Sequence, residues 1–291
     1  MEFIKFFLVV AIALVLAKSV TSSNPKSLLD YQREYTGNFS HPKIINGKPA
    51  DEKEFPYFVG IIEFNPFLIF ARCGGAIIHP KWVLTSGFCV EDSQIADSVV
   101  FLLEMGSIVS GAPRVEYILT SSSVFLHPGF DSDTMDNDIA LLSLPSSVPN
   151  DEYVRPVALA AEDTSKESLV GQFITIAGFG ATSDDGTLPE ILQEGNTAQI
   201  PIISDIACEI SSNGYQLPTS PIFCSRGNSG RSAPAMCIGD SGAPATVMMN
   251  GVPTLVGIGS AILGSGCGNS PQIYTYIPEF CPWIDEIIAN N

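Results

Sequence analysis

The sequence predicts an all-β protein built as barrels or a sandwich. Short runs of β-branched and aromatic residues recur along the chain, and clusters of Gly, Pro, Asn and Asp separate them. This is the pattern of short strands joined by turns. Only the last stretch looks helical, because several apolar side chains there fall on one helical face. Those residues are Ile277, Phe280, Ile284, Ile287 and Ile288.

Each predicted strand rests on one of these runs. They lie at residues 58–62, 75–78, 82–85, 99–102, 173–176 and 254–258. The chain has 291 residues, of which 45% are hydrophobic and 15% charged, so it can bury a sizeable core as one large unit or two packed subdomains.

The formal net charge is −17, and it becomes more negative without residues 1–43, which hold more basic than acidic side chains. An acidic surface repels phosphate backbones and anionic lipids, so we expect neither nucleic acid nor a membrane as partner. The alternative is that the acidity only keeps a secreted protein soluble.

The first residues have the form of a secretory signal peptide. An apolar run from Phe6 to Ala17 follows a basic residue and is too short to cross a bilayer, which takes about 20 residues. We place the signal peptide at residues 1–19, with its end between Ala17 and Ser22, and a propeptide at residues 20–43. The mature chain is then expected to be secreted and extracellular, where disulfides are the usual state of cysteine.

Three segments carry a resemblance to a known family. They are Trp82-Val83-Leu84-Thr85-Ser86-Gly87-Phe88-Cys89, Asn137-Asp138-Ile139-Ala140-Leu141-Leu142 and Gly239-Asp240-Ser241-Gly242-Ala243-Pro244. Together they resemble the trypsin and chymotrypsin family of serine proteases, over residues 44–291. The resemblance implies a chymotrypsin-like fold of two antiparallel six-stranded Greek-key β-barrels with a C-terminal α-helix. It also implies a cleft between the barrels and a crossing from one to the other near residues 146–155.

Phe88 stands where this resemblance leads one to expect a histidine. In the family a serine attacks the carbonyl, a histidine takes and returns the proton, and a buried aspartate orients the histidine. Phenylalanine has no titratable atom, and a serine hydroxyl without a base is a feeble nucleophile. Loss of the histidine from a related triad costs roughly a millionfold in turnover. We therefore expect Asp138 and Ser241 to be remnants of a triad that no longer works.

The other histidines are not expected to replace the missing base. The chain contains only His41, His79 and His127. His41 lies in the predicted propeptide, His79 precedes Pro80 at a predicted hairpin turn, and His127 lies in a predicted loop. The resemblance places the last two outside the cleft, beyond the reach that proton transfer requires.

Other parts of the site are kept or changed. The backbone N–H groups of Gly239 and Ser241 could still form an oxyanion hole, which needs only main-chain geometry. Asp138 loses its ionic partner, so its pKa should be raised unless Ser260 and backbone donors satisfy it. Ala243 adds a methyl group where active relatives usually have glycine.

The primary specificity pocket also departs from the family pattern. Ala235 stands at the pocket floor by resemblance, so a preference for Lys or Arg lacks its carboxylate. Ser260-Ala261-Ile262 stands where Ser-Trp-Gly is common, and Gln272 stands where a glycine is usual. Because glycines there leave room for a substrate side chain, Ile262 and Gln272 are expected to narrow or close the pocket.

The segment Ile44-Ile45-Asn46-Gly47 is similar to the amino terminus that trypsin-like zymogens expose when cut after a basic residue, here Lys43. In that family the freed ammonium pairs with the carboxylate beside the serine, here Asp240. Buried charges are tolerable as a pair, and such a pair can order the surrounding loops. The alternative is that Lys43 is an ordinary exposed lysine before a strand.

All seven cysteines follow the predicted propeptide. The resemblance pairs Cys73 with Cys89, Cys208 with Cys224, and Cys237 with Cys267. Cys281 is left over, either as a buried thiol, which its place on the apolar face of the last helix favours, or in an intermolecular disulfide. One glycosylation sequon begins at Asn38.

These features predict a secreted, catalytically inactive serine protease homologue, resembling those of invertebrate and particularly insect origin, that acts by binding a protein. The partner would be a protease, a protease substrate or an inhibitor. We expect a monomer, and no motif indicates a cofactor or a metal ion. Two alternatives remain open. One is weak proteolysis or esterolysis at Ser241, with a base supplied by the substrate or water; the other is an interaction protein with a plugged cleft.

Overall fold

In the computed structural model, the described strands and helices lie between Lys48 and Asn290. The described residues are 44, 47–65, 68–94, 99–181, 193–194, 200–212, 214–226, 234–264, 267 and 270–291. The predicted signal peptide (residues 1–19) and propeptide (residues 20–43), with Asn38, His41 and Lys43, lie outside them. Within these ranges, no helix is both long and apolar enough to cross a membrane.

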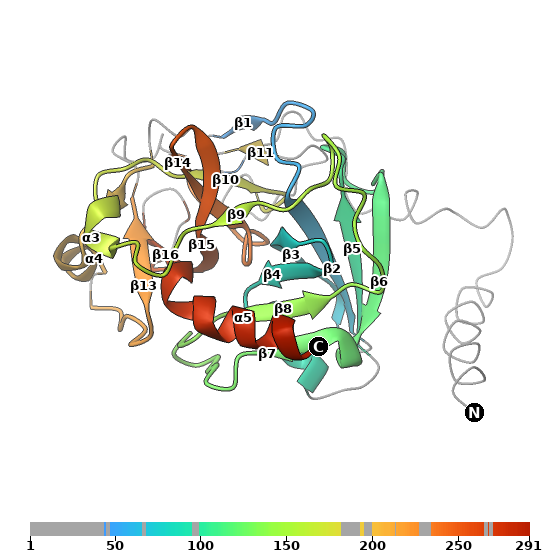
Figure 1. Cartoon of the computed structure of the whole chain (residues 1–291). Coiled ribbons are helices and arrows are strands. Elements are labelled where there is room, and N and C mark those ends of the chain that lie inside the picture. The colour runs from blue at the N-terminus through green and yellow to red at the C-terminus, as the bar shows by residue number, and fades with distance from the viewer. Residues whose placement is uncertain are drawn as a thin grey trace, which may run out of the picture. The chain divides into compact units, whose positions relative to one another are not determined.

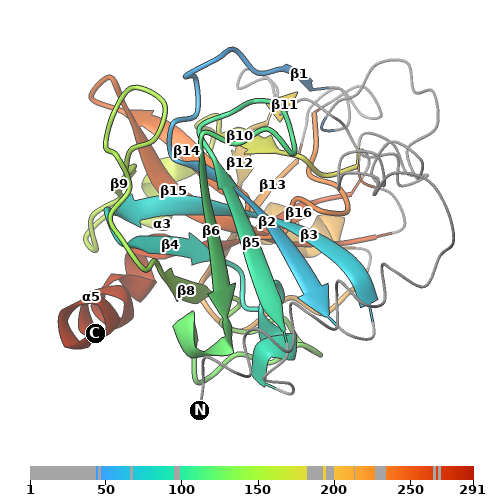
Figure 2. The ribbon, with the colours of Figure 1, turned by 90° about the vertical axis from the view of Figure 1, so that its right-hand side faces the viewer.

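The first sheet has seven strands, in the order β6-β5-β2-β3-β4-β8-β7, and all of its neighbours are antiparallel. Figure 2 shows its long strands β6, β5, β2 and β3 side by side. Its strands are β2 Phe58–Asn65, β3 Leu68–His79, β4 Trp82–Thr85, β5 Val100–Met105, β6 Val115–Thr120, β7 Val124–Leu126 and β8 Ala140–Ser143.

The second sheet has nine strands, of which eight follow the order β1-β11-β10-β14-β15-β16-β13-β12. The ninth, β9, pairs in parallel with β15. The strands are β1 Lys48–Pro49, β9 Ala158–Leu159, β10 Thr175–Gly178, β11 Gln193–Glu194, β12 Ile202–Ile203, β13 Ile222–Ser225, β14 Pro244–Met249, β15 Val252–Ile262 and β16 Gln272–Tyr276.

The all-β prediction is confirmed: the chain forms two curled antiparallel sheets and a C-terminal helix, as in trypsin-like proteins (Figure 1). Within the described residues the two sheets have seven and nine strands, compared with the six each that the resemblance implies; in the second sheet, short strands such as β1 and β11, of two residues each, add to the count. The last strand of the first sheet ends at Ser143, and the next strand, in the second sheet, begins at Ala158. The chain therefore passes from one sheet to the other between these residues.

The expectation that only the last stretch is helical was wrong. α5 Cys281–Asn290 follows the 3-10 turn η5 Ile277–Phe280, but the structure also contains α3 Lys166–Leu169, α4 Asp205–Ser211, η1 Glu91–Gln94 and η2 Ser121–Ser123. These segments are too short for an apolar repeat to show, since a helical repeat needs a window of about 11 residues or more.

Three main apolar clusters fill the fold. One lies within the first sheet, around Phe101 and Leu142, and another within the second, around Phe223 and Tyr274. A third joins Trp82 and Leu141 of the first sheet with Ile258 of the second and Ile284 of α5. The C-terminal helix is thus packed against both halves and helps to hold them together.

Candidate active site

Two hydrogen bonds tie the halves of the fold together beside the site. The Gly74 backbone N–H, on β3, donates to the Ser241 carbonyl at 2.7 Å. The Thr275 hydroxyl, on β16, donates to the Asp138 carbonyl at 2.7 Å. Both acceptors are main-chain atoms. The structure thereby brings the segments of Asp138 and Ser241 together at the junction of the two sheets.

Phe88 lies in the turn that follows β4. Its backbone N–H donates to Oδ1 of Asp138 at 2.8 Å, while its ring is 47% exposed. The neighbouring Cys89 places its sulfur 3.4 Å from the carbonyl oxygen of Ser241. The main chain at Phe88 and Cys89 is thus held next to Asp138 and Ser241, and the phenylalanine ring offers no atom that could accept or return a proton.

Asp138 is 1% exposed, and only one of its carboxylate oxygens is fully satisfied. Oδ2 of Asp138 and Oγ of Ser260 are both buried without a hydrogen bond of normal geometry. Burial raises the pKa of Asp138 to about 6, although the nearby Ser260 hydroxyl and the backbone of Phe88 and Gly87 favour the charged form. The carboxylate is therefore an orphan for which an imidazole ring would be the natural partner.

The loop around Ser241 keeps a sharp backbone turn. Gly239 and Gly242 have φ angles of 93° and 76°, a region that favours glycine. Ala243 is buried, and its backbone faces Gly74, where an added Cβ would lie 2.6 Å from the Ala243 Cα. The close approach of the Ala243 backbone is thus possible because Gly74 has no side chain.

Asp240 is buried at 1% exposure. Its carboxylate accepts hydrogen bonds from the backbone N–H groups of Gly180, at 2.8 Å, and Cys237, at 3.0 Å. Burial raises the pKa of Asp240 to about 7, against the effect of these two donors. The described residues give it no ion-pair partner. Ile44 is fully buried in the apolar cluster of the same half.

Gln272 is buried in a network beside Ala235, which is itself 1% exposed. Oε1 of Gln272 accepts hydrogen bonds from the Met236 backbone N–H and the Tyr274 hydroxyl, both at 3.0 Å. The Tyr274 hydroxyl in turn accepts one from Ser225 at 3.3 Å. The amide side chain is therefore committed to internal partners.

Met236 and Ile262 add apolar volume to this region. The Met236 side chain is buried. Its sulfur lies 2.5 Å from the position that a Cβ on Gly259, the residue before Ser260, would take. Ile262 is partly buried and packs against Ala181 and the Cys237–Cys267 disulfide. Sequence reasoning missed Met236, because its contact with Gly259 depends on how the loop folds back onto β15.

Ile238 was also missed by sequence reasoning. It is 67% exposed and precedes Gly239, three residues from Ser241. Together with the exposed ring of Phe88, it places apolar surface on both segments that meet at Ser241. The signal in the sequence that could have indicated Ile238 was a large apolar residue immediately before the Gly239-Asp240-Ser241 motif.

The two described histidines have other partners. His79 ends β3, and its Nδ1 accepts a hydrogen bond from the Lys81 backbone N–H at 3.3 Å. The ring of His127 packs against Phe280 and Trp283 of the C-terminal segment, with ring centroids 5.5 Å and 5.1 Å apart. Burial lowers the pKa of His127, so it is held as a neutral packing residue.

The three predicted disulfides are confirmed: Cys73–Cys89, Cys208–Cys224 and Cys237–Cys267. Cys281 is a free, buried thiol. Its pKa is raised to about 11, mainly by burial and further by Asp285 and Glu162. Among the described residues, no group of three or more His, Cys, Asp or Glu side chains is arranged to hold a metal ion.

Comparison with known proteins places this geometry among its relatives. The family model described as Trypsin matches residues 44–284. Trypsin-1 of Astacus astacus is 31% identical over 244 residues, which are 83% of this chain and 98% of that protein. Serine protease SP24D of Anopheles gambiae is 30% identical over 253 residues, 84% of this chain and 81% of that protein.

A further relative is much longer. Protein masquerade of Drosophila melanogaster is 29% identical over 275 residues, which are 91% of this chain but 25% of that protein. The chain thus spans nearly all of one relative's length and about a quarter of another's.

Proposed function

Because the chain belongs to the trypsin family of serine proteases, we propose that it is a secreted, catalytically inactive homologue that acts by binding another protein. One observation carries the proposal. Phe88 stands where the family resemblance leads one to expect the proton carrier, its backbone N–H donates to Asp138, and both His79 and His127 are engaged by other partners. Without a base, Ser241 is a poor nucleophile.

The pocket residues support the same proposal. Gln272 and Met236 are buried where a substrate side chain would enter a trypsin-like pocket, and Gln272 is engaged by two hydrogen bonds. Emptying that space would leave a buried amide and a buried hydroxyl without partners, which is costly. Restoring the base alone should therefore not restore cleavage after large side chains.

Binding is supported by what the site exposes. Phe88 and Ile238 present apolar surface on the two segments that meet at Ser241. Exposed apolar side chains of this size are typical of protein contact sites. The partner would be a protease, a protease substrate or an inhibitor that recognises a protease-like cleft. Secretion fits the three disulfides, which form in oxidising compartments.

Residual hydrolysis is the second candidate, favoured by one observation. Gly239 keeps a positive φ of 93° beside Ser241, so the loop retains the backbone form that can present N–H groups to an oxyanion. Such a site can retain about a thousandfold acceleration over water without a triad.

The test begins with the purified chain cut after Lys43, offered a panel of peptide and ester substrates. We expect no turnover from the natural protein and none from Ser241→Ala. We expect Phe88→His to gain activity only towards esters and substrates with small side chains. Turnover by the natural protein that disappears in Ser241→Ala would overturn the inactive assignment and establish the hydrolase instead.

Binding is tested separately, with Phe88→Ser and Ile238→Ser against the control Val252→Ser, which changes an exposed residue on a different hairpin. A purified trypsin-family protease, one of its protein inhibitors and one of its protein substrates serve as probes. We expect the two cleft variants to weaken binding while the control leaves it unchanged. Equal binding by all three variants would contradict binding through the cleft.

A further inference from the structure

Helix α4 carries both of its isoleucines on the outside. Ile206 is 71% exposed and Ile210 is 75% exposed. Being four residues apart, they are neighbours on one helical face. Cys208, halfway between them, is 1% exposed and lies on the inner face. A single exposed isoleucine is common on a surface, but two in consecutive positions of one face form an apolar ridge.

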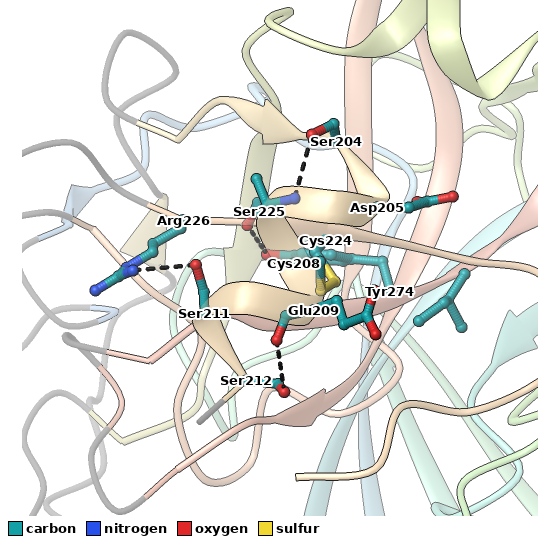
Figure 3. Close-up of a disulfide and its surroundings, with 12 residues drawn as sticks. Ser204, Asp205, Cys208, Glu209, Ser211, Ser212, Cys224, Ser225, Arg226 and Tyr274 are labelled. Carbon is teal, nitrogen blue, oxygen red and sulfur yellow. Dashed lines mark hydrogen bonds between the residues drawn. A yellow bond between two sulfur atoms is a disulfide. The ribbon is translucent and has the colours of Figure 1, made fainter. Parts of the chain in front are cut away.

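The ridge sits on a helix that is held in place from several sides. The Ser204 hydroxyl caps it by accepting a hydrogen bond from the Ala207 backbone N–H at 3.3 Å. Figure 3 shows Cys208 bonded to Cys224 of β13, and Arg226 donating to the Ser211 hydroxyl, at 3.2 Å. A surface fixed in this way loses little conformational freedom on binding, which favours affinity.

An acidic row runs beside the apolar one. Asp205 and Glu209 are also four residues apart, and each directly precedes one of the isoleucines. Both are exposed. Lys166 already pairs with Asp205 at 2.7 Å, whereas Glu209 has no ion pair within the described ranges. A partner surface that complements this face would therefore be apolar and carry a cation beside its apolar side chains.

We propose that this face of α4, formed by Ile206, Ile210 and Glu209, docks an amphipathic helix of a partner protein whose apolar stripe is bordered by Lys or Arg. A helical ridge packs into the grooves between the side chains of a second helix. The two isoleucines supply the apolar contact, and Glu209 selects the cation beside it. The surface lies on a different element from the cleft, and the proposal does not depend on whether Ser241 is active.

The probe is a synthetic helical peptide with leucines on one face and lysines elsewhere, and its counterpart has glutamate in place of every lysine. Each is titrated calorimetrically into the full-length chain. We expect the lysine peptide to bind and the glutamate peptide not to bind. The double variant Ile206→Ser/Ile210→Ser should weaken binding about tenfold or more, which corresponds to about 1.4 kcal/mol. Glu209→Lys should weaken binding of the lysine peptide more than Val252→Ser does, which is the control at an exposed apolar residue.

Two outcomes would overturn the proposal. If the double serine variant binds the lysine peptide as well as the natural chain does, the peptide is held only by the net charge of −17. If sedimentation shows a natural dimer that the double variant dissolves, the ridge serves a second copy of this chain. Thermal melting of each variant excludes misfolding as the cause, since the substitutions leave the Cys208–Cys224 disulfide intact.

Discussion

Oδ1 of Asp138 receives the backbone N–H of Phe88 at 2.8 Å, while its Oδ2 is buried without a hydrogen bond. One oxygen of this carboxylate is thus satisfied by the main chain, whereas the other has no partner. Burial therefore penalises the charged form of Asp138, and the hydrogen bond from Phe88 offsets only part of that penalty.

We predict that Asp138→Asn stabilises the protein above about pH 6. Burial raises the pKa of Asp138 to about 6, above its unfolded value, so the folded state holds its proton more tightly. The penalty is absent at low pH and appears as pH rises through this range. An amide carries no charge and can donate to Ser260. Urea unfolding should show a gain of about 1–3 kcal/mol at pH 8 and little change at pH 4; a loss of stability at pH 8 would contradict the orphan assignment.

The intact chain should lose stability as pH rises from about 4 to 7. Asp240 and Glu63 both have pKa values raised to about 7, Asp240 by burial and Glu63 mainly by burial with help from Asp92. A group with a raised folded pKa favours the protonated state, so deprotonation costs folding free energy. The half-buried Asp136, whose pKa is lowered by hydrogen bonds from Ser220 and Thr219, affects stability only at more acidic pH.

Cleavage after Lys43 should make the free energy of unfolding depend less on pH, because a free amino group on Ile44 would pair with Asp240. The measurement is the free energy of unfolding against pH for cut and uncut chain, with Asp240→Asn as the control that removes the titration. Identical profiles for cut and uncut protein would argue against the pairing.

Gln272→Ala should destabilise the protein by about 1–3 kcal/mol, because it leaves the Met236 N–H and the Tyr274 hydroxyl buried without their acceptor. The matched control is Gln172→Ala, which removes an exposed glutamine and should change the free energy of unfolding by less than about 0.5 kcal/mol. Chemical denaturation measures both. Equal effects of the two substitutions would mean that the Gln272 network contributes nothing.

Cys281 should resist alkylation in the folded protein. It is 8% exposed, and its pKa is raised to about 11, so little thiolate forms at pH 8 and reagents have poor access. Iodoacetamide labelling followed by mass spectrometry should show one modified cysteine only after unfolding in denaturant without reductant. Rapid labelling of the native chain would contradict burial of the thiol, whereas a covalent dimer on a non-reducing gel would support the intermolecular alternative.

Much of the sheet structure follows from local patterns. The run at residues 82–85 coincides with β4. The run at 99–102 begins one residue before β5, and the run at 173–176 begins two residues before β10. Strand ends depend on pairing partners that are distant in sequence, so such offsets are expected. Helix α4 escaped prediction because its isoleucines point outwards and its inner face is held by a disulfide.

The residues of the candidate site were likewise predictable only in part. Motif spacing was enough to select Asp138, Ser241 and Phe88, because these stand within recognisable segments. The burial of Met236 was not predictable, since its contact with Gly259 depends on how its loop folds back onto β15.

The bonds from Gly74 to Ser241 and from Thr275 to Asp138 end on carbonyl oxygens, which every residue type possesses. The alignment of the two halves is accordingly indifferent to which side chains stand at positions 88, 138 and 241. A substitution at any of these three positions can therefore change the chemistry of the site while the two halves stay aligned, so a fold of this kind can acquire a binding role without being rebuilt.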